Sequence, residues 1–277
     1  MAAWADRLPA TVARVAQEWS LDLGPPYQPG GRTAWVAPVR TAAGERAVLK
    51  VGWRHDEAMH QAAGLHAWDG RGAVRCLADL TVADADTDAL LLEVCEPGAP
   101  LSTARPPVEQ DAVLAGLLRR LWIDPAPGHP FRPLAAMCAW WADGFERRYA
   151  AAGPACRIDP GLARAGAALF RELPTSAPER VLLGTDLHAG NVLAAGREPW
   201  LVIDPKPYVG DPTYDALQHL LNQRDRLTTD PGGTADRIAH LLDLDRRRLR
   251  TWLFARAVVE SVEQPWLHPV ARALATG

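Results

Sequence analysis

The feature that most constrains this chain is the spacing of three polar side chains in one stretch, GTDLHAGNVLAAGREPWLVIDPKP, at residues 184–207. Asp186 follows the apolar segment VLLG, Asn191 lies five residues later at the start of NVLAA, and Asp204 ends PWLVID. The apolar segments are short strand candidates around the turn GRE. If these strands form a hairpin, Asp204 returns to a position beside Asn191. An ordinary surface loop does not need polar residues at these intervals.

These residue types suit the transfer of a phosphoryl group. Because that group is rich in negative charge, its transfer depends on positioning and on neutralising cations. Mg²⁺ prefers carboxylate and amide oxygens, which Asp204 and Asn191 offer, while the Asp186 carboxylate would face an acceptor hydroxyl. One such residue alone is more often a turn or cap residue, but the three together at this spacing favour catalysis.

The first ninety or so residues mix strand and helix patterns. The predicted elements, in chain order, are a helix over 9–21, strands over 33–39 and 46–52, a helix over 56–68, and strands over 73–82 and 89–94. The second strand carries Lys50, which together with Lys206 makes up all the lysines of an arginine-rich sequence. We therefore expect a small mixed sheet with one helix packed on it and a functional role for Lys50. Lys206 could contact a phosphate or brace the loop, and both roles stay open.

A proline-rich stretch, CEPGAPLSTARPP at 95–107, marks the best domain boundary. After it the pattern turns helical. The predicted helices cover residues 108–122, 134–152, 161–173, 213–227 and 234–264. We expect an α+β chain with a small N-terminal sheet lobe, residues 1–95, and a larger, mostly helical C-terminal lobe, residues 96–277.

The composition argues against several classes of protein. The chain has 277 residues, 48% of them hydrophobic, which is enough for two lobes that each have a core. The net charge of −3, without a basic tail or stripe, argues against a nucleic-acid partner. No apolar run approaches the ~20 residues of a membrane span, and the N-terminus lacks an apolar signal core.

The cysteines form no CxxC pair and are expected to be free thiols; they are Cys76, Cys95, Cys138 and Cys156. We therefore expect a cytoplasmic protein. A monomer is also expected, although nothing in the sequence bears on the oligomeric state.

The motif also carries a family resemblance. Asp186 and Asn191 match the D-x-x-x-x-N spacing of the kinase catalytic loop, which a metal-binding aspartate follows. The segment LLGTDLHAGNVL resembles the HGDLHxGN motif of the aminoglycoside phosphotransferase family, relatives of the protein kinases. The segment DLHAGNVLAAGREPWLVIDPKPYVGDPTYD is similar to its streptomycin 6-phosphotransferase and hydroxyurea kinase branch. The resemblance covers nearly the whole chain and implies a two-lobed, protein-kinase-like fold that uses ATP and Mg²⁺.

The resemblance assigns roles position by position. It makes Asp186 the catalytic residue, Asn191 and Asp204 the metal ligands, and residues 1–95 the nucleotide-binding lobe. The family usually has glutamate near the position of Gln61, so Glu57, one helical turn away, is offered as the carboxylate partner of Lys50. The nucleotide-binding residues implied are Lys50 on the phosphates, Gly30 and Gly31 in the loop above them, Glu57, and Glu93 to Cys95, whose backbone would bond the adenine edge.

The chain departs from the family pattern at Gly184 and Thr185, where the family has His-Gly. This departure removes a brace behind the loop but no metal ligand or base. Asp211 and Asp215 in GDPTYD are expected to brace the loop and cap the following helix. His188 is expected to be a structural hydrogen-bonding residue.

For the substrate, the resemblance points to O-phosphorylation of an aminoglycoside, streptomycin first, bound among the C-terminal helices. The acidic residues considered as contacts for a cationic sugar are Asp143, Glu146, Glu260 and Glu263. One alternative is a kinase of hydroxyurea or of another small hydroxylated metabolite. Another is a non-catalytic kinase-like protein that binds nucleotide or a partner, which the departures at Gly184, Thr185 and Gln61 keep open.

Overall fold

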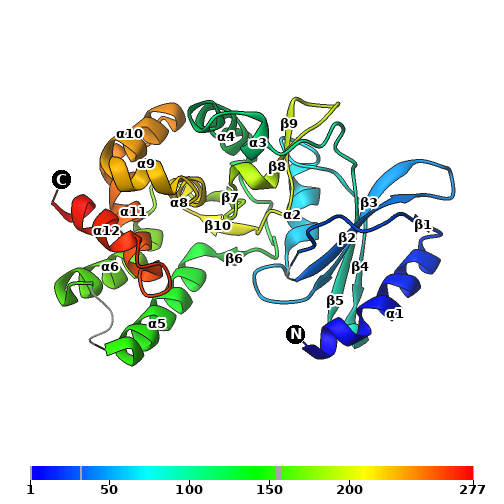
Figure 1. The fold of residues 1–277 in the computed structure, drawn as a ribbon, viewed down its shortest axis with the longest axis horizontal. Coiled ribbons are helices and arrows are strands. Elements are labelled where there is room, and N and C mark those ends of the chain that lie inside the picture. The colour runs from blue at the N-terminus through cyan, green and yellow to red at the C-terminus, as the bar shows by residue number, and fades with distance from the viewer. Residues whose placement is uncertain (1, 32, 154–157, 277) are drawn as a thin grey trace. The chain divides into compact units, whose positions relative to one another are not determined.

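The computed structural model describes residues 2–31, 33–153 and 158–276, and these fall into two compact units. Unit 1 comprises Met1–Pro100 with Leu193–Lys206, and unit 2 comprises Leu101–Val192 with Pro207–Gly277. The sequence predicts two continuous lobes, whereas Leu193–Lys206 groups with the N-terminal part of the chain. The α+β class is confirmed, with an antiparallel sheet first and a largely helical part after it (Figure 1).

Among the described residues, unit 1 is built on a five-stranded sheet with the strand order β1-β2-β3-β5-β4. Its strands are β1 (Asp22–Leu23), β2 (Ala34–Arg40), β3 (Arg46–Trp53), β4 (Cys76–Val82) and β5 (Thr87–Leu92). All neighbouring pairs are antiparallel. Lys50 on β3 lies opposite Val36 of β2 and Leu90 of β5.

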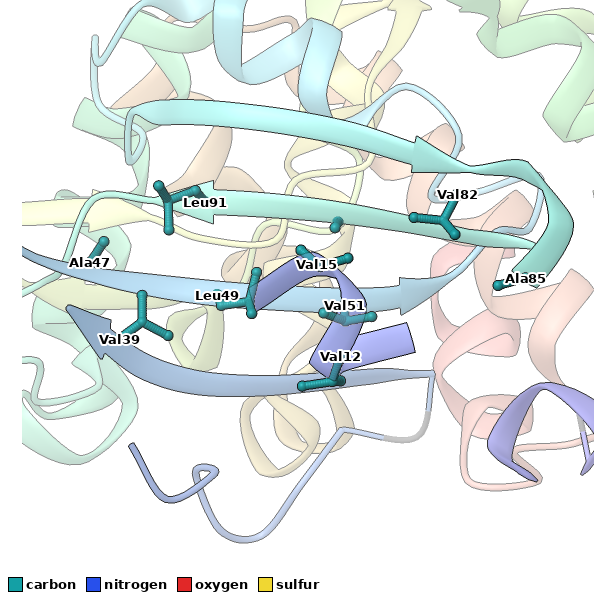
Figure 2. Packing of buried hydrophobic residues seen from close by; sticks show 10 residues of the cluster. Val12, Val15, Val39, Ala47, Leu49, Val51, Val82, Ala85 and Leu91 are labelled. Carbon is teal, nitrogen blue, oxygen red and sulfur yellow. The ribbon is translucent and has the colours of Figure 1, made fainter. Parts of the chain in front are cut away.

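Helix α1 (Ala2–Glu18) covers one face of this sheet. Figure 2 shows Val12 and Val15 of α1 packed against inward-facing strand residues that include Val39, Leu49 and Val51. Because side chains alternate between the faces of a strand, residues 47, 49 and 51 of β3 face α1. Lys50 therefore lies on the opposite face.

Helix α2 (Gln61–Trp68) and the hairpin of β8 (Val192–Ala194) and β9 (Trp200–Val202), apart from the first residue of β8, complete unit 1. The amide of Val74 donates to the carbonyl of Val202 at 3.0 Å, and the amide of Val202 donates to the carbonyl of Gly72 at 2.8 Å. The amide of Gly98 donates to the carbonyl of Ala194 at 2.9 Å. These bonds attach the hairpin to the N-terminal part of the chain and thereby place Asp204, two residues after β9.

Unit 2 is mainly helical (Figure 1). Its helices are α3 (Leu101–Ala104), α4 (Pro107–Leu121), α5 (Leu134–Ala152), α6 (Pro160–Glu172), α7 (Pro212–Asp215), α8 (Leu217–Leu221), α9 (Arg224–Thr229), α10 (Pro231–Leu242), α11 (Arg246–Glu260) and α12 (Leu267–Ala275), with short 3₁₀ turns η3 (Leu173–Ser176) and η4 (Ala189–Asn191). A small sheet joins β6 (Arg132–Pro133), β10 (Tyr208–Gly210) and β7 (Val181–Leu183) in that order.

Helix α11 packs against α6, α10 and α12 and forms the centre of unit 2. The side chains of Leu249, Trp252 and Leu253 on α11 are completely buried. A β-carbon added at Gly166 of α6 would lie 2.4 Å from Cβ of Val258 on α11. Glycine at this position therefore allows α6 and α11 to approach closely.

Two of the long helices predicted from periodicity are wrong. The region 213–227 forms α7, α8 and α9, and the region 234–264 divides into α10 and α11. Asp243 takes a left-handed conformation (φ 58°) that ends α10, and the Asp245 carboxylate accepts from the amide of Arg248 at 2.7 Å and caps α11. Aspartate favours such local bonds, so two aspartates interrupt an otherwise continuous helical pattern.

No helix in the described part of the chain is long and apolar enough to span a membrane. Cys76, Cys95 and Cys138 are free thiols, as predicted. Cys156 lies outside the described residues.

Candidate active site

In unit 1, three of the side chains singled out by the sequence form one hydrogen-bonded group. Lys50 Nζ donates to Asp204 Oδ1 at 2.5 Å and to Gln61 Oε1 at 2.8 Å. Gln61 Nε2 donates to the same Asp204 Oδ1 at 2.9 Å. The group joins strand β3, the first residue of α2 and the segment after β9.

The charges of this group favour an ionised Asp204. Burial alone would raise the pKa of Asp204, but the charge and hydrogen bond of Lys50, the charge of Lys206 and the Gln61 amide hold this pKa below its ordinary value. The Asp204 side chain is still about half exposed, at 46%. Both bonds just described end on Oδ1, so the carboxylate has a second oxygen to offer to a cation.

The predicted pairing of Lys50 with Glu57 is wrong. The sequence predicts a helix from residue 56, which would place Glu57 and Gln61 on one face. Helix α2 instead begins at Gln61, and residues 56–60 form turns. Among the described residues, Lys50 meets Gln61 and Asp204, and Gln61 is itself buried, with 5% exposed. The partner from α2 is therefore an amide, which leaves the Asp204 carboxylate to balance the lysine charge.

The other residues expected to bind nucleotide come from two segments of unit 1. A β-carbon at Gly30 would meet nothing within 4 Å, and one at Gly31 would lie 3.2 Å from the carbonyl oxygen of Ala34. Glu93 and Cys95 follow β5. Burial, together with the nearby charge of Glu93, raises the pKa of the half-buried Cys95 thiol to about 11.

The side chain of Glu93 is held by an arginine that the sequence did not reveal. Arg197 Nε donates to Glu93 Oε1 at 2.8 Å, and a second guanidinium nitrogen donates to Oε2 at 3.0 Å. The same guanidinium donates to the carbonyls of Gly70 and Ala73 at 2.7 and 3.0 Å. The Glu93 amide donates to the carbonyl of Arg75 at 2.9 Å. The carboxylate and amide of Glu93 are thus used inside unit 1, and the side chain has a structural role.

In unit 2, Asp186 and Asn191 lie on the turn that follows β7. The amide of Asp186 donates to the carbonyl of Gly184 at 2.7 Å, and Asn191 Nδ2 donates to the carbonyl of Asp186 at 3.1 Å. The latter bond fixes the Asn191 amide through its nitrogen, so its oxygen is the atom available to a cation. His188 Nδ1 accepts from the Gly190 amide at 3.1 Å and caps η4, as expected of a structural residue.

A buried carboxylate supports this turn from behind. Asp215 Oδ2 accepts from the amide of Gly184 at 3.0 Å, and Oδ1 accepts from the amide of Thr185 at 2.6 Å. Trp122 Nε1 donates to Oδ2 at 3.1 Å. The expected brace is confirmed for Asp215. Burial raises the pKa of this completely buried carboxyl to about 6, although all three donors act to lower it.

Asp215 also holds an unfavourable backbone. Thr185 has φ 46°, which is uncommon for a β-branched residue and costs about 1–2 kcal/mol. The related family has glycine here, which adopts this conformation without that cost. In this chain the buried carboxylate accepts from the amide of the strained residue and from the amide of the residue before it, so the loop has a brace although the family's histidine is absent.

Asp211 caps α7, as expected, and is held by partners far away in the sequence. Its Oδ1 accepts from the amide of Thr213 at 2.9 Å. Its Oδ2 accepts from Trp252 Nε1 at 2.6 Å and from Arg248 Nε at 2.8 Å. No sequence pattern indicates that Arg248, Trp252 or Trp122 holds an aspartate, because each lies tens of residues from the aspartate that it contacts.

The four acidic residues considered for a cationic substrate are all paired with arginines. Asp143 and Glu146 both bind Arg171, at 2.6 and 2.8 Å. Glu260 forms an ion pair with the buried Arg256. Glu263 lies 3.6 Å from Arg148. Their negative charge is therefore largely balanced within unit 2.

The family of the chain follows from comparison with known proteins. Residues 23–265 match the family described as "Aminoglycoside/hydroxyurea antibiotic resistance kinase". The chain is 39% identical over 259 residues to a hydroxyurea phosphotransferase of Kitasatospora aureofaciens, covering 91% of this chain and 71% of that protein. It is 36% identical over 262 residues to a streptomycin 6-kinase of Streptomyces griseus, covering 92% of this chain and 82% of that protein.

The fold is similar to that of solved structures at low sequence identity. A crystal structure of an aminoglycoside phosphotransferase with ADP and hygromycin B has a TM-score of 0.61 at 14% identity, and the match covers 95% of this chain and 97% of that one. This likeness confirms the protein-kinase-like fold. The chain belongs to the aminoglycoside/hydroxyurea antibiotic resistance kinase family and is a small-molecule kinase, an enzyme that transfers phosphate to a hydroxyl group.

Proposed function

We propose that this chain transfers the γ-phosphoryl group of ATP to a hydroxyl of an aminoglycoside antibiotic, with streptomycin as the first acceptor to test. The observation that carries the proposal is the Lys50–Asp204–Gln61 group of unit 1, in a chain whose turn after β7 carries Asp186 and Asn191. A lysine, an amide oxygen and two carboxylates are the groups that a kinase uses on nucleotide and acceptor.

Lys50 binds the nucleotide phosphates in this proposal. Its ammonium already has a carboxylate partner in Asp204, so a triphosphate would compete for it with a denser negative charge. The oxygen donors fit Mg²⁺, since Asp204 offers a carboxylate and Asn191 an amide oxygen, and Mg²⁺ prefers such hard ligands. The ion, when bound, would neutralise charge on the phosphates. Gly30 and Gly31 would lie beside the phosphates, and backbone groups between Glu93 and Cys95 would bond the base.

Asp186 orients the acceptor hydroxyl and accepts its proton. Asp215 is a positioning residue in this proposal, because it holds the Gly184 and Thr185 amides directly before Asp186. The departure from the family's His-Gly pattern is therefore compatible with an active enzyme, which argues against the non-catalytic alternative.

The choice of acceptor rests on the comparisons and on the charges of unit 2. The similarity to a streptomycin 6-kinase covers 82% of that enzyme and supports an aminoglycoside. One observation favours hydroxyurea as a second candidate. Asp143, Glu146, Glu260 and Glu263 share three arginines, so these four residues offer little unbalanced negative charge to a polycation. The 39% identity to a hydroxyurea phosphotransferase agrees with a small, neutral acceptor.

The first prediction concerns the acceptor. Purified full-length chain with Mg²⁺ and ATP should phosphorylate streptomycin, as detected by ADP release and by the mass of the product. Hydroxyurea and an acceptor-free reaction are run beside it. Transfer to hydroxyurea alone would replace the first candidate by the second, and ADP release without any phosphorylated acceptor would reject both.

The second prediction concerns Asp186. Asp186→Asn should lower kcat by about 100-fold or more, because general acid–base catalysis contributes about 10²–10⁴-fold, while nucleotide affinity stays within twofold. The exposed Asp225 offers a matched control, and Asp225→Asn should leave both quantities unchanged. Turnover like that of the wild type in Asp186→Asn would refute the assignment of Asp186.

The third prediction compares the two residues considered as partners of Lys50. Gln61→Ala removes one bond to the lysine and one to Asp204, and hydrogen bonds to charged groups contribute about 1.5–3 kcal/mol. The KM for ATP should therefore rise roughly tenfold or more. Glu57→Ala should change it less than twofold. The opposite ranking of the two variants would restore Glu57 as the partner.

The fourth prediction concerns pH. The pKa of Asp215 is about 6 in the folded protein, above its ordinary value of 3.8. Between these values the folded state binds more protons than the unfolded chain, so the stability contributed by this group falls as pH rises through this range. The protonated carboxyl, however, is a poorer acceptor for the Gly184 and Thr185 amides. We therefore expect kcat to fall roughly tenfold from pH 7 to pH 5, about one unit below the pKa.

Asp215→Asn supplies the test of that assignment. The amide cannot accept from both backbone groups and does not titrate, so kcat should be low at pH 7 and should lack the decline near pH 6. The profile is measured with the same acceptor for both proteins. An unchanged decline in Asp215→Asn would assign it to another group.

A further inference from the structure

A second group of side chains in unit 1 has the composition of a metal site. His66 Nε2 lies 2.8 Å from Asp79 Oδ1, and one ligand atom from each of His66, Cys76 and Asp79 lies within 4.8 Å of the other two. His66 is on α2, and Cys76 and Asp79 are on β4. We propose that His66, Cys76 and Asp79 form a Zn²⁺ site that fastens helix α2 to strand β4.

A bulge in β4 makes this arrangement possible. Residues three apart in a regular strand point to opposite faces. In β4 the pairing shifts between Cys76 and Ala78, so that Cys76 lies opposite Leu92 and Asp79 opposite Leu90. Leu90 and Leu92 share one face of β5, so Cys76 and Asp79 do as well. Bulges often re-aim a side chain in this way.

The shared face is the one that carries the Lys50 group. Leu90 also lies opposite Lys50 in the register, and Ala78 and Leu80 of β4 pack on the other side, against the core beneath α1. His66 reaches the same face from α2, five residues after Gln61. The helix that supplies a ligand is therefore the helix whose first residue holds Lys50 and Asp204.

The donor set favours zinc over the harder cations. Imidazole nitrogen, thiolate sulfur and carboxylate oxygen bind Zn²⁺ at ~2.0–2.3 Å in tetrahedral geometry, whereas Mg²⁺ and Ca²⁺ take oxygen ligands. Those bond lengths place ligand atoms ~3.5 Å apart, so small side-chain rotations would widen the 2.8 Å spacing of His66 Nε2 and Asp79 Oδ1 and bring the Cys76 sulfur to the same distance. His66 and Asp79 are about half exposed, which gives the ion access and leaves a fourth position for water.

A simpler explanation is an exposed histidine–aspartate pair beside an unrelated thiol. Cys76 Sγ makes only a weak contact of 3.4 Å with the carbonyl of Ala78. Burial, with the charge of Asp79, raises the pKa of this thiol to about 11, so Cys76 is a poor nucleophile in the metal-free protein. Zinc binding would displace its proton. The two explanations differ in whether the sulfur binds a metal ion.

The test uses the metal-free full-length chain without nucleotide and with excess Mg²⁺, which occupies oxygen sites but does not compete for sulfur. Calorimetric titration with Zn²⁺ should show one equivalent bound, and Co²⁺ should give a thiolate-to-metal charge-transfer band. Cys76→Ser should abolish the band, and His66→Asn and Asp79→Asn should each weaken Zn²⁺ binding at least tenfold. Cys95→Ser and His240→Asn are the matched controls and should bind as the wild type does.

The melting temperature gives a second readout. With free Zn²⁺ at about 100 times its Kd, the Tm of the wild type should rise by about 5 °C or more, and that of folded Cys76→Ser should not. The Co²⁺ spectrum of the wild type does not depend on any variant folding. A wild-type spectrum without the thiolate band, or Zn²⁺ binding retained in Cys76→Ser, would overturn the proposal.

Discussion

The ion pair between Lys50 and Asp204 is the interaction on which the arrangement of unit 1 depends. It joins positions 154 residues apart, and it requires both that Lys50 face away from α1 and that the β8–β9 hairpin return to the N-terminal part of the chain. Gln61 stabilises both charged groups from the start of α2. Lys50 and Asp204 are the groups that we propose to bind the nucleotide phosphates and the metal ion, and Gln61 holds both of them, so the contacts that hold unit 1 together also prepare its chemistry.

Unit 2 is organised around buried carboxylates. Asp111, Asp211 and Asp215 are completely buried, and each is surrounded by donors. Burial alone would raise the pKa of Asp111, but hydrogen bonds from His219, Arg226 and Arg237 hold it well below its ordinary value. Asp215 has amide and indole donors without a cation, and its pKa is raised instead. An unpaired buried charge is costly, so these partners fix how the surrounding helices and loops pack.

Much of the fold followed from local patterns. Alternating apolar residues located β2, β3, β4 and β5 to within a few residues, and helical spacing located α4, α5 and α6. Apolar periodicity does not reveal the break at Asp243 and Asp245 or the late start of α2, because the apolar pattern continues across both regions. The predicted start of α2 at residue 56 places Glu57 and Gln61 on one helical face, whereas residues 56–60 form turns. The wrong partner for Lys50 follows from this wrong helix start.

The sequence by itself determined the class of chemistry, because the order and spacing of Asp186, Asn191 and Asp204, with Lys50 upstream, are local properties of the chain. It also determined most of the strands and helices. Only the tertiary structure decided which groups bond to one another: Gln61 to Lys50, Asp215 to the amides before Asp186, Arg197 to Glu93, and Cys76 near His66. The physical reason is that these partners are distant in the chain, and only packing and strand register bring them within hydrogen-bonding range.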